Sequence, residues 1–222
     1  TMGDYLNRWG FTLQRPLKKA YEQQTKLVKK WLDETYPQIE KQAKVENAEI
    51  HWGDETGLRS DNHFGRGYSP RGKTPVINVS AKRVSVNMIS AITNQGKVRF
   101  MMYKKNMNST VLIKFLKQLV KINKRKIYLI LDNLRVHHAY LVRDWLAEHV
   151  LDIEIFYLPS YSPELNPDEY LNGDLKRGVF SQSPSRSEKD LKKKVISFMR
   201  KLQKSPTRVA NYFHNHNISY AA

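Results

Sequence analysis

The chain has 222 residues, of which 40% are hydrophobic, enough for one sizeable domain with an appendage, and it contains no Cys. The absence of Cys excludes disulfides and thiolate metal sites. Because there is neither an apolar run near the roughly 18 residues of a membrane span nor a secretory signal, a reducing cytoplasm or nucleoid is the simplest location. Lys and Arg outnumber Asp and Glu by 38 to 21, and the net charge of +17 favours a polyanionic partner over a merely well-solvated basic protein.

Residues 1–45 are predicted to form a helical extension. The stretch "RPLKKAYEQQTKLVKKWLDETYP" starts at a Pro and carries apolar residues at helical spacing, which predicts an amphipathic helix that ends before Pro37. The residues of its apolar stripe are Leu27, Val28, Trp31 and Leu32. The preceding segment, "GDYLNRWGFT", is too short to fold alone and is interpreted as the end of an upstream region.

From residue 46 the pattern changes to strands. In "AEIHWGDET", alternation places Ile50, Trp52 and Asp54 on one face of a strand that ends near Asp54. A polar stretch rich in Gly and Arg, residues 57–75, follows as a loop. "RVSVNMISAIT" and "KVRFMMYK" then flank the turn sequence "NQG" and predict an antiparallel hairpin.

The second half alternates helices with strands. "NSTVLIKFLKQLVKIN" is predicted to be a helix capped by Ser109, "HHAYLVRDWLAEH" a second helix, and "NPDEYLNGDLKRGVF" a third with Pro167 in its first turn. "KIYLILD" and "IEIFYL" are unbroken apolar runs typical of strands buried on both faces. "SEKDLKKKVISFMRKLQK" follows as an amphipathic helix. The order predicts an α/β fold with a mixed five-stranded sheet, helices on its faces, and parallel later strands.

Carboxylates stand at the ends of these predicted elements. Asp54 and Asp132 each end a predicted strand, and adjacent strand ends are where ligands bind in open α/β sheets. A third acid would come from "LPSYSPELNPDEYLNGDLK". The candidates there are Glu164, Asp168 and Glu169. Spacing alone leaves this choice open, because Asn166 and Glu169 could instead form a capping box, and because Asp54 and Asp132 could each be turn or cap residues.

Three carboxylates in one pocket would require a cation. Two of them about 4 Å apart repel by roughly 4 kcal/mol at an effective dielectric of 20. Oxygen-only ligands select hard ions such as Mg²⁺ or Mn²⁺, and two such ions can stabilise the attacking and leaving oxygens of a phosphodiester displacement. In a basic protein, this pattern favours phosphoryl transfer on nucleic acid.

At these residues the sequence resembles a known family. "HWGDETGL", "LILDNLRVHHA" and "LPSYSPELNPDEYLNGDLK" resemble the three catalytic blocks of DDE transposases of the mariner superfamily, and "GRGYSPRGKTP" resembles a loop of its bacterial insertion-sequence branch. The resemblance covers residues 46–180 and implies a ribonuclease-H-like fold. In the family motif "YSPxLNPxE" the last Glu is the third acid. The resemblance therefore implies that Asp54, Asp132 and Glu169 are catalytic and bind two Mg²⁺ or Mn²⁺ ions, with Asp168 in a variable position.

The resemblance also implies cut-and-paste transposition. DNA would be cleaved at the terminal inverted repeats, and the freed 3′-hydroxyl would attack target DNA, usually at TA, with a dimer pairing two ends. Residues 3–16 resemble the end of the family's helix-turn-helix region. We therefore expect a catalytic fragment, with residues 1–45 as linker and helix-turn-helix remnant, and residues 46–222 as the catalytic domain. The alternatives are a transposase-derived DNA-binding protein without strand transfer, or a ribonuclease-H-type nuclease.

Several further residues are candidates for supporting roles. The predicted DNA contacts are Arg59, Arg66, Arg71, Lys73, His137 and His138. The basic residues could instead belong to a solvated loop, and His137 could start a helix or bond to Asp132. Asn133 could orient a water on a metal ion or could serve the turn after the strand. Lys192, Lys193 and Lys194 fit a solvated helix face better than a DNA contact, and Trp52 and Trp145 are core candidates.

Overall fold

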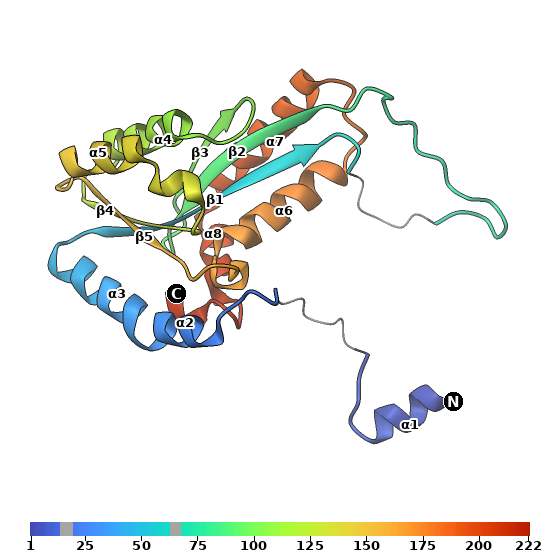
Figure 1. Ribbon diagram of the computed structural model, residues 1–222. Helices are drawn as coiled ribbons and strands as arrows, with labels where there is room; N and C mark the ends of the chain where they lie inside the picture. The colour runs from blue at the N-terminus through green and yellow to red at the C-terminus, as the bar shows by residue number, and fades with distance from the viewer. Residues whose placement is uncertain (14–19, 63–67) are drawn as a thin grey trace.

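The computed structural model describes residues 1–13, 20–62 and 68–222. Within these residues, five strands form one mixed sheet (Figure 1). The strands are β1 (Glu49–Arg59), β2 (Ser85–Ile92), β3 (Val98–Tyr103), β4 (Ile127–Leu131) and β5 (Ile153–Tyr157). Their spatial order is β3-β2-β1-β4-β5, with β1, β4 and β5 parallel and β2 and β3 antiparallel to their neighbours. The predicted sheet, with its hairpin and its parallel later strands, is confirmed.

Helices cover both faces of this sheet. The α-helices are α1 (Met2–Arg8), α2 (Thr25–Lys30), α3 (Tyr36–Val45), α4 (Ser109–Ile122), α5 (Tyr140–Glu148), α6 (Asp168–Phe180), α7 (Glu188–Gln203) and α8 (Pro206–Ala210). The shorter turns are the π-helical η1 (Trp31–Thr35) and the 3₁₀ turns η2 (Arg135–His138), η3 (Pro163–Leu165), η4 (Asn211–His214) and η5 (Ser219–Ala221). α4 and α5 pack on one face of the sheet, and α6 and α7 pack on the other.

The two faces follow from strand alternation. All five residues of β4 are buried, as expected for an apolar strand between two parallel neighbours. Tyr128 and Ile130 of β4 belong to the core on the α6–α7 face, together with Trp52 of β1. Leu129 and Leu131 belong to the core on the α4–α5 face, which also buries Trp145. Both Trp residues are therefore core residues, as predicted.

β1 is longer than predicted. The strand continues to Arg59, five residues beyond Asp54, because β2 remains paired with it up to the Arg59–Ser85 pair. Its parallel pairing with β4 ends at Trp52, opposite Ile130. Asp54 therefore lies inside a strand rather than at its end. It still lies at the edge of the parallel part of the sheet, just beyond the carboxyl end of the β1–β4 pairing.

The N-terminal extension differs from its prediction. The helical run does not end before Pro37 but continues through η1 and α3 to Val45. A Pro ring normally clashes with the carbonyl of the preceding turn, and here Pro37 stands in the first turn of α3 directly after the wider π-helical turn. Trp31 and Tyr36 are buried and pack against Trp52, with Tyr36 and Trp52 ring centroids 5.4 Å apart. The predicted helix also starts later than expected, because residues 20–24 are not helical and α2 begins at Thr25, while residues 14–19 lie outside the described residues.

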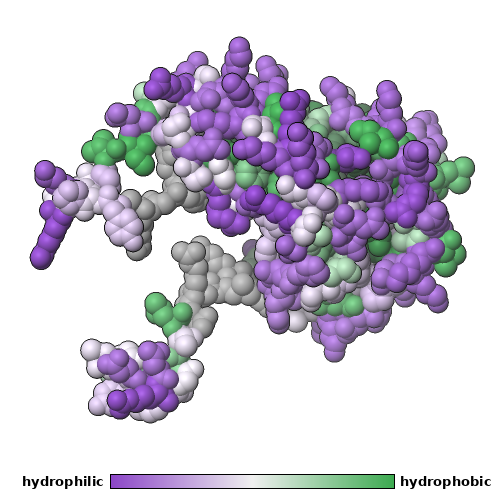
Figure 2. Space-filling model, turned by 180° about the vertical axis from the view of Figure 1, so that it is seen from behind, coloured by the Kyte–Doolittle hydropathy of each residue, from purple (hydrophilic) through white to green (hydrophobic). Residues whose placement is uncertain are grey.

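Two helix starts also differ from their predictions. Asn108, rather than Ser109, caps α4, because its side chain accepts a hydrogen bond from the Val111 amide at 2.9 Å. The helix predicted to begin at His137 is divided into η2 and α5. No helix in the described part of the chain is long and apolar enough to cross a membrane. Hydrophilic residues cover most of the side of the protein that Figure 2 shows.

Candidate active site

A cavity of about 380 Å³ opens at the carboxyl end of β4. Asp54 of β1, Asp132 directly after β4, and Glu169 in the first turn of α6 all line it. Of the three candidates for the third acid, Glu169 is the one that lines this cavity. Asp168 is fully buried and accepts a hydrogen bond from Ser90 Oγ at 2.6 Å. Glu164 instead accepts a hydrogen bond from Gln23 at 2.6 Å. The structure thus brings Asp54, Asp132 and Glu169 to one cavity.

Asn166 joins α6 to β1 beside the acids. Its Nδ2 donates to the Gly53 carbonyl at 3.0 Å, and its Oδ1 accepts from the Asp168 amide at 3.0 Å. A side chain at Gly53 would crowd Leu131 at 2.8 Å and the Ser90 carbonyl at 3.0 Å, so Gly allows this close approach. The predicted capping role of Asn166 is modified, because α6 starts at Asp168 and the Asn166 side chain bonds to both a helix and a strand.

The carboxylates of the cavity are electrostatically strained. Burial raises the pKa of Asp54 well above its ordinary value, and Glu169 is the largest of the neighbouring charges that raise it further. Burial and then Glu55 raise the pKa of Asp132 to about 6. Burial also raises the pKa of Glu169, against a smaller opposing effect of Lys176. Each acid therefore holds its proton more tightly than usual, which a bound cation would reverse.

Asn172 orients one of these acids. Its Nδ2 donates to Asp54 Oδ2 at 2.8 Å. Asn172 follows Glu169 by three residues on α6, so both side chains lie on one face of the helix. The spacing of three residues from Glu169 is the sequence signal that could have identified Asn172.

His137 is buried beside Asp132. Its Nδ1 lies 2.9 Å from the Asp132 carbonyl oxygen and 3.4 Å from Asp132 Oδ1, and its Nε2 lies 2.9 Å from Glu55 Oε1. Since a carbonyl and a carboxylate both accept, the ring fits best as an imidazolium that donates from both nitrogens. Burial opposes this charge, but Glu55 and Asp132 outweigh it and raise the pKa of His137. Ligand atoms of Glu55, Asp132 and His137 lie within 4.8 Å of one another.

The position of His137 corrects the DNA-contact prediction for this residue. The side chain has no exposed surface, and both ring nitrogens are bonded inside the protein. The alternative of a bond to Asp132 agrees with the structure. No sequence pattern points to Glu55, because strand alternation places it on the face opposite Asp54, and its partner His137 is distant in the sequence.

The other supporting candidates lie around the cavity or outside it. Asn133 lines the cavity, but its amide bonds to His138 Nε2 at 2.6 Å and to Ser160 Oγ at 3.2 Å. His138 is exposed, with its ring centroid 4.2 Å from that of Tyr157. Arg59 is paired with Asp61 at 2.9 Å. Arg71 and Lys73 are exposed in the loop before β2, and Arg66 lies outside the described residues.

Similarity to solved structures defines the class of fold. The chain is similar to the Mos1 transposase paired-end complex with left transposon end, with a TM-score of 0.69 and 17% identity over 99% of this chain and 70% of that chain. It is also similar to the catalytic domain of Mos1 mariner transposase, with a TM-score of 0.56 and 16% identity over 94% of this chain and 98% of that chain. At such identities the likeness shows the fold alone, which is ribonuclease-H-like.

The family follows from the sequence itself. Residues 49–192 match the family described as DDE superfamily endonuclease, and this chain belongs to that family. Residues 1–35 match a second family, described as winged helix-turn helix. Among curated proteins, no sequence matches this chain.

Proposed function

We propose that this protein is a mariner-superfamily transposase of the bacterial insertion-sequence branch. It cleaves DNA at transposon ends and joins those ends to target DNA in the bacterial nucleoid. The observation that carries the proposal is the convergence of Asp54, Asp132 and Glu169, from three separate elements, on one cavity of a DDE-family chain. Cleavage at terminal inverted repeats and joining at TA follow from the resemblance of the three motifs.

The donor set of the cavity fits two Mg²⁺ or Mn²⁺ ions. All three acids offer oxygen, the donor that these hard ions prefer. Burial raises the pKa of each acid, and neighbouring carboxylates raise those of Asp54 and Asp132 further, so a cation in the cavity would relieve an unfavourable charge. Two of the similar structures are Mos1 mariner paired-end complexes with Mn and with Mg. When bound, the ions would activate a water or a 3′-hydroxyl and stabilise the leaving oxygen of the phosphodiester.

The remaining residues hold the acids in place. Asn172 fixes the Asp54 carboxylate through one oxygen, and Asn166 ties the start of α6, and with it Glu169, to β1. His137 fixes the main chain at Asp132 and offsets part of its charge. These contacts preorganise the carboxylates before metal or DNA arrives, which reduces the reorganisation needed during reaction.

The partners follow from the same proposal. The similar structures include a paired-end complex and a strand-transfer complex of Mos1, from which we infer two protein copies that pair two DNA ends. We infer that residues 1–45 act as a linker and as part of a helix-turn-helix region, and that residues 46–222 act as the catalytic domain. Arg71, Lys73, Arg66 and His138 remain candidates for contacts to the DNA backbone.

Cleavage of a plasmid tests the proposal. A supercoiled plasmid carrying the inverted repeats that flank the gene is incubated with the protein and Mg²⁺ or Mn²⁺, and nicked and joined products are measured. We expect cleavage that EDTA stops and that Asp132→Asn abolishes, with DNA affinity intact or higher because one negative charge is removed. Asp144→Asn, which changes an exposed acid on α5, is the matched control and should retain full activity.

The products separate the alternatives. Turnover by Asp132→Asn at the wild-type rate would refute the assignment of the site. Cleavage without joined products would indicate a nuclease, and binding without metal-dependent cleavage would indicate a DNA-binding protein. Either result would overturn the strand-transfer part of the proposal.

A further inference from the structure

One face of α7 carries a row of basic side chains outside the candidate active site. These exposed residues are Lys189, Lys192, Lys193, Arg200, Lys201 and Lys204. Their spacing of mostly three, four or seven residues keeps them on one side of the helix. The opposite side of α7 faces the core through Leu191, Val195 and Met199. With Ile196 and Ser197, the basic residues line an open groove of about 570 Å³.

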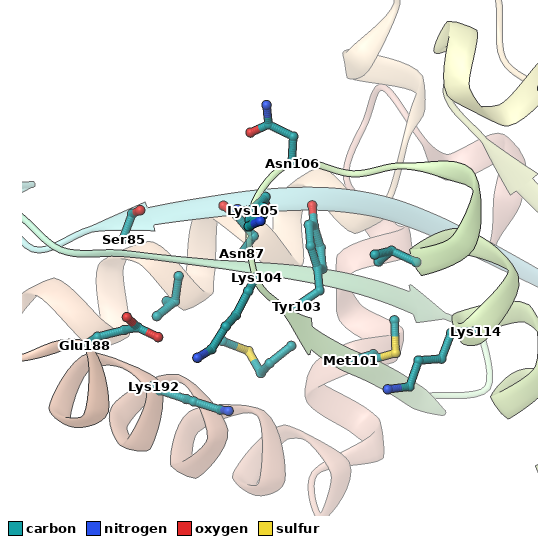
Figure 3. Close-up of a pocket in the computed structure, with 13 residues that line it drawn as sticks. Ser85, Asn87, Met101, Tyr103, Lys104, Lys105, Asn106, Lys114, Glu188 and Lys192 are labelled. Carbon is teal, nitrogen blue, oxygen red and sulfur yellow. Dashed lines mark hydrogen bonds between the residues drawn. The ribbon is translucent and has the colours of Figure 1, made fainter.

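The basic row continues around the edge of the sheet at β3. Lys192 also lines a neighbouring cavity of about 540 Å³, to which Lys104, Lys105 and Lys114 belong. Figure 3 shows that Lys104, directly after β3, points toward Glu188 and Lys192 at the start of α7, while Lys114 approaches from α4. We call the nine basic residues of the two cavities the α7–β3 basic surface. Glu188 is the one acid that lines it.

The charges of the α7–β3 basic surface are not neutralised by the protein. Among the described residues, no carboxylate forms an ion pair with any of the nine. Their neighbour Lys194 behaves differently, because it lies 3.6 Å from Asp190 and donates to the Ser183 carbonyl at 2.6 Å. Like charges three or four residues apart weaken a helix. The helix dipole favours Arg200 and Lys201 in the last turn of α7 but disfavours cations near its start, so helix stability does not account for Lys189, Lys192 and Lys193.

We propose that the α7–β3 basic surface binds the sugar–phosphate backbone of a DNA duplex, without regard to sequence. This inference rests on the proposed function in taking DNA as the polyanion. It adds a second contact region, because this surface and the active-site cavity share no lining residue. The DNA it holds lies outside the cavity in which the acids would cleave.

The dimensions of α7 fit this ligand. Lys189 and Lys204 are fifteen residues apart, which corresponds to about 22 Å along an α-helix. That length is roughly two-thirds of one turn of B-DNA, and duplex DNA carries one negative charge per about 1.7 Å of its axis. Lys residues at the end of an edge strand can also prevent pairing with other strands. That explanation covers Lys104 and Lys105 but not the row on α7.

The test compares two triple variants of the full chain. Lys189→Gln, Lys193→Gln and Lys201→Gln together remove three charges from α7, and Gln keeps a good helix propensity. The matched control, Lys117→Gln, Lys121→Gln and Lys124→Gln, removes three charges from α4 and the loop after it. Binding of a 40-base-pair duplex of arbitrary sequence is measured in EDTA across a range of salt concentrations. Circular dichroism checks that each variant is folded.

We expect the α7 variant to lose affinity and salt dependence. Each phosphate contact contributes about 0.9 to the slope of log affinity against log salt, so three lost contacts reduce the slope by up to about 2.7. The affinity near 0.1 M salt should fall about tenfold or more, and the control should match the wild type. Retention of wild-type affinity and slope by the α7 variant would overturn the proposal. An equal loss in both variants would do the same, since it would reflect net charge alone.

Two further measurements separate this inference from the proposed function. In the first, polyglutamate and unlabelled DNA compete with the bound duplex at equal concentrations of negative charge. Equal displacement by the two polyanions would overturn the choice of DNA as the ligand. The α7 variant should retain metal-dependent cleavage at saturating DNA, with the loss appearing in KM rather than kcat. Failure of Asp132→Asn to affect cleavage would refute the candidate active site and leave the binding result standing.

Discussion

At the scale of single residues, Glu55 and His137 support the candidate site by holding Asp132 in position from outside the cavity. Neither lines the cavity, yet His137 bonds to the main chain of Asp132 and to the carboxylate of Glu55. Glu55 faces the side of the sheet that α4 and α5 cover, so the pair links that layer to the segment after β4. Residues that orient metal ligands in this way commonly change metal affinity or activity by about 10- to 100-fold when they are replaced.

We predict that His137→Gln lowers cleavage about 10- to 100-fold and raises the Mn²⁺ concentration needed for half-maximal activity. Gln can replace one of the two hydrogen bonds but not the charge, which leaves Glu55 buried without its cation. The free energy of unfolding should therefore also fall by about 1–3 kcal/mol. His214→Gln, at an exposed position of η4 that does not line the cavity, is the control. An unchanged Mn²⁺ requirement in His137→Gln would show that the residue is purely structural.

A second prediction concerns Asp54 in the absence of metal. Burial and the charge of Glu169 raise its pKa, so the ionised carboxylate destabilises the folded state at neutral pH. Asp54→Asn removes that charge and keeps an acceptor for Asn172. We expect the free energy of unfolding in EDTA to rise by on the order of 1 kcal/mol while cleavage is lost, as in other trade-offs between stability and activity. A denaturant titration with and without metal measures both effects, and lower stability in EDTA would contradict the prediction.

Part of this site could be predicted from the sequence, for definite reasons. Asp54 and Asp132 follow apolar strand residues, so local pattern was enough to place them near the sheet edge. Glu169 needed the family motif, because Asp168 next to it has the same chemistry and also lies in the first turn of α6. The Glu55–His137 contact joins positions 82 residues apart, and no local pattern predicts such a pair.

At the scale of elements, α6 and α7 approach closely at Gly178. A Cβ at this position would collide with the ring of Phe198 on α7, whereas a Cβ at Gly173, on the same helix, would meet an Arg177 nitrogen at an ordinary 3.5 Å. The two glycines therefore have different roles. Gly178 allows the two helices to pack, and Gly173 only lowers the helix propensity of α6.

We predict opposite effects for the two substitutions. Gly178→Ala should lower the free energy of unfolding by about 1–3 kcal/mol, the usual penalty for overpacking. Gly173→Ala should raise it by about 0.5–1 kcal/mol, because Ala is the better helix former. Urea denaturation monitored by circular dichroism gives both values. Equal effects of the two substitutions would show that the α6–α7 contact is looser than the structure indicates.

The same scale shows where sequence patterns fail. β4 and β5 were predicted because buried parallel strands are uniformly apolar. The helix expected to end before Pro37 continues instead, since a π-helical turn widens the backbone where the Pro ring would clash. β1 extends beyond its predicted end because β2 pairs with it past Asp54. Both failures come from tertiary or backbone effects that residue identity alone does not reveal.

At the scale of the whole molecule, the acids of the candidate site and the basic residues of the α7–β3 basic surface lie in different places. The chain carries +17 overall, yet the acids of the candidate site gather at one cavity while the α7–β3 basic surface lies apart from it. A positive field of this size raises the rate at which a polyanion arrives. The acids of the cavity act in the opposite sense until a metal ion compensates them. Metal binding should therefore raise the stability of the folded protein and be required for activity at the cavity.

The pH dependence of metal binding follows from this separation. The pKa of Asp132 in the folded protein is about 6, above its ordinary value of 3.8, so the folded state holds this proton more tightly than the unfolded state. The stability that this proton contributes is complete below about pH 3.8 and is lost as the pH rises through about 6. At high pH a divalent ion can bind the ionised Asp132 carboxylate directly. At low pH the ion must first displace the proton from that carboxylate.

We therefore predict that Mn²⁺ raises the Tm more at pH 8 than at pH 5. At a concentration of about 100 Kd, binding adds roughly 2.7 kcal/mol, which corresponds to about 5–10 °C for a chain of this size. At pH 5 the increase should be less than about half as large. The neighbouring His51 lowers the pKa of Glu49 to about 2, so Glu49 makes the opposite contribution to the pH dependence of stability. Comparing thermal scans with and without metal at the same pH cancels this contribution. An equal increase at both pH values, or one that persists in Asp132→Asn, would place the ion outside this cavity.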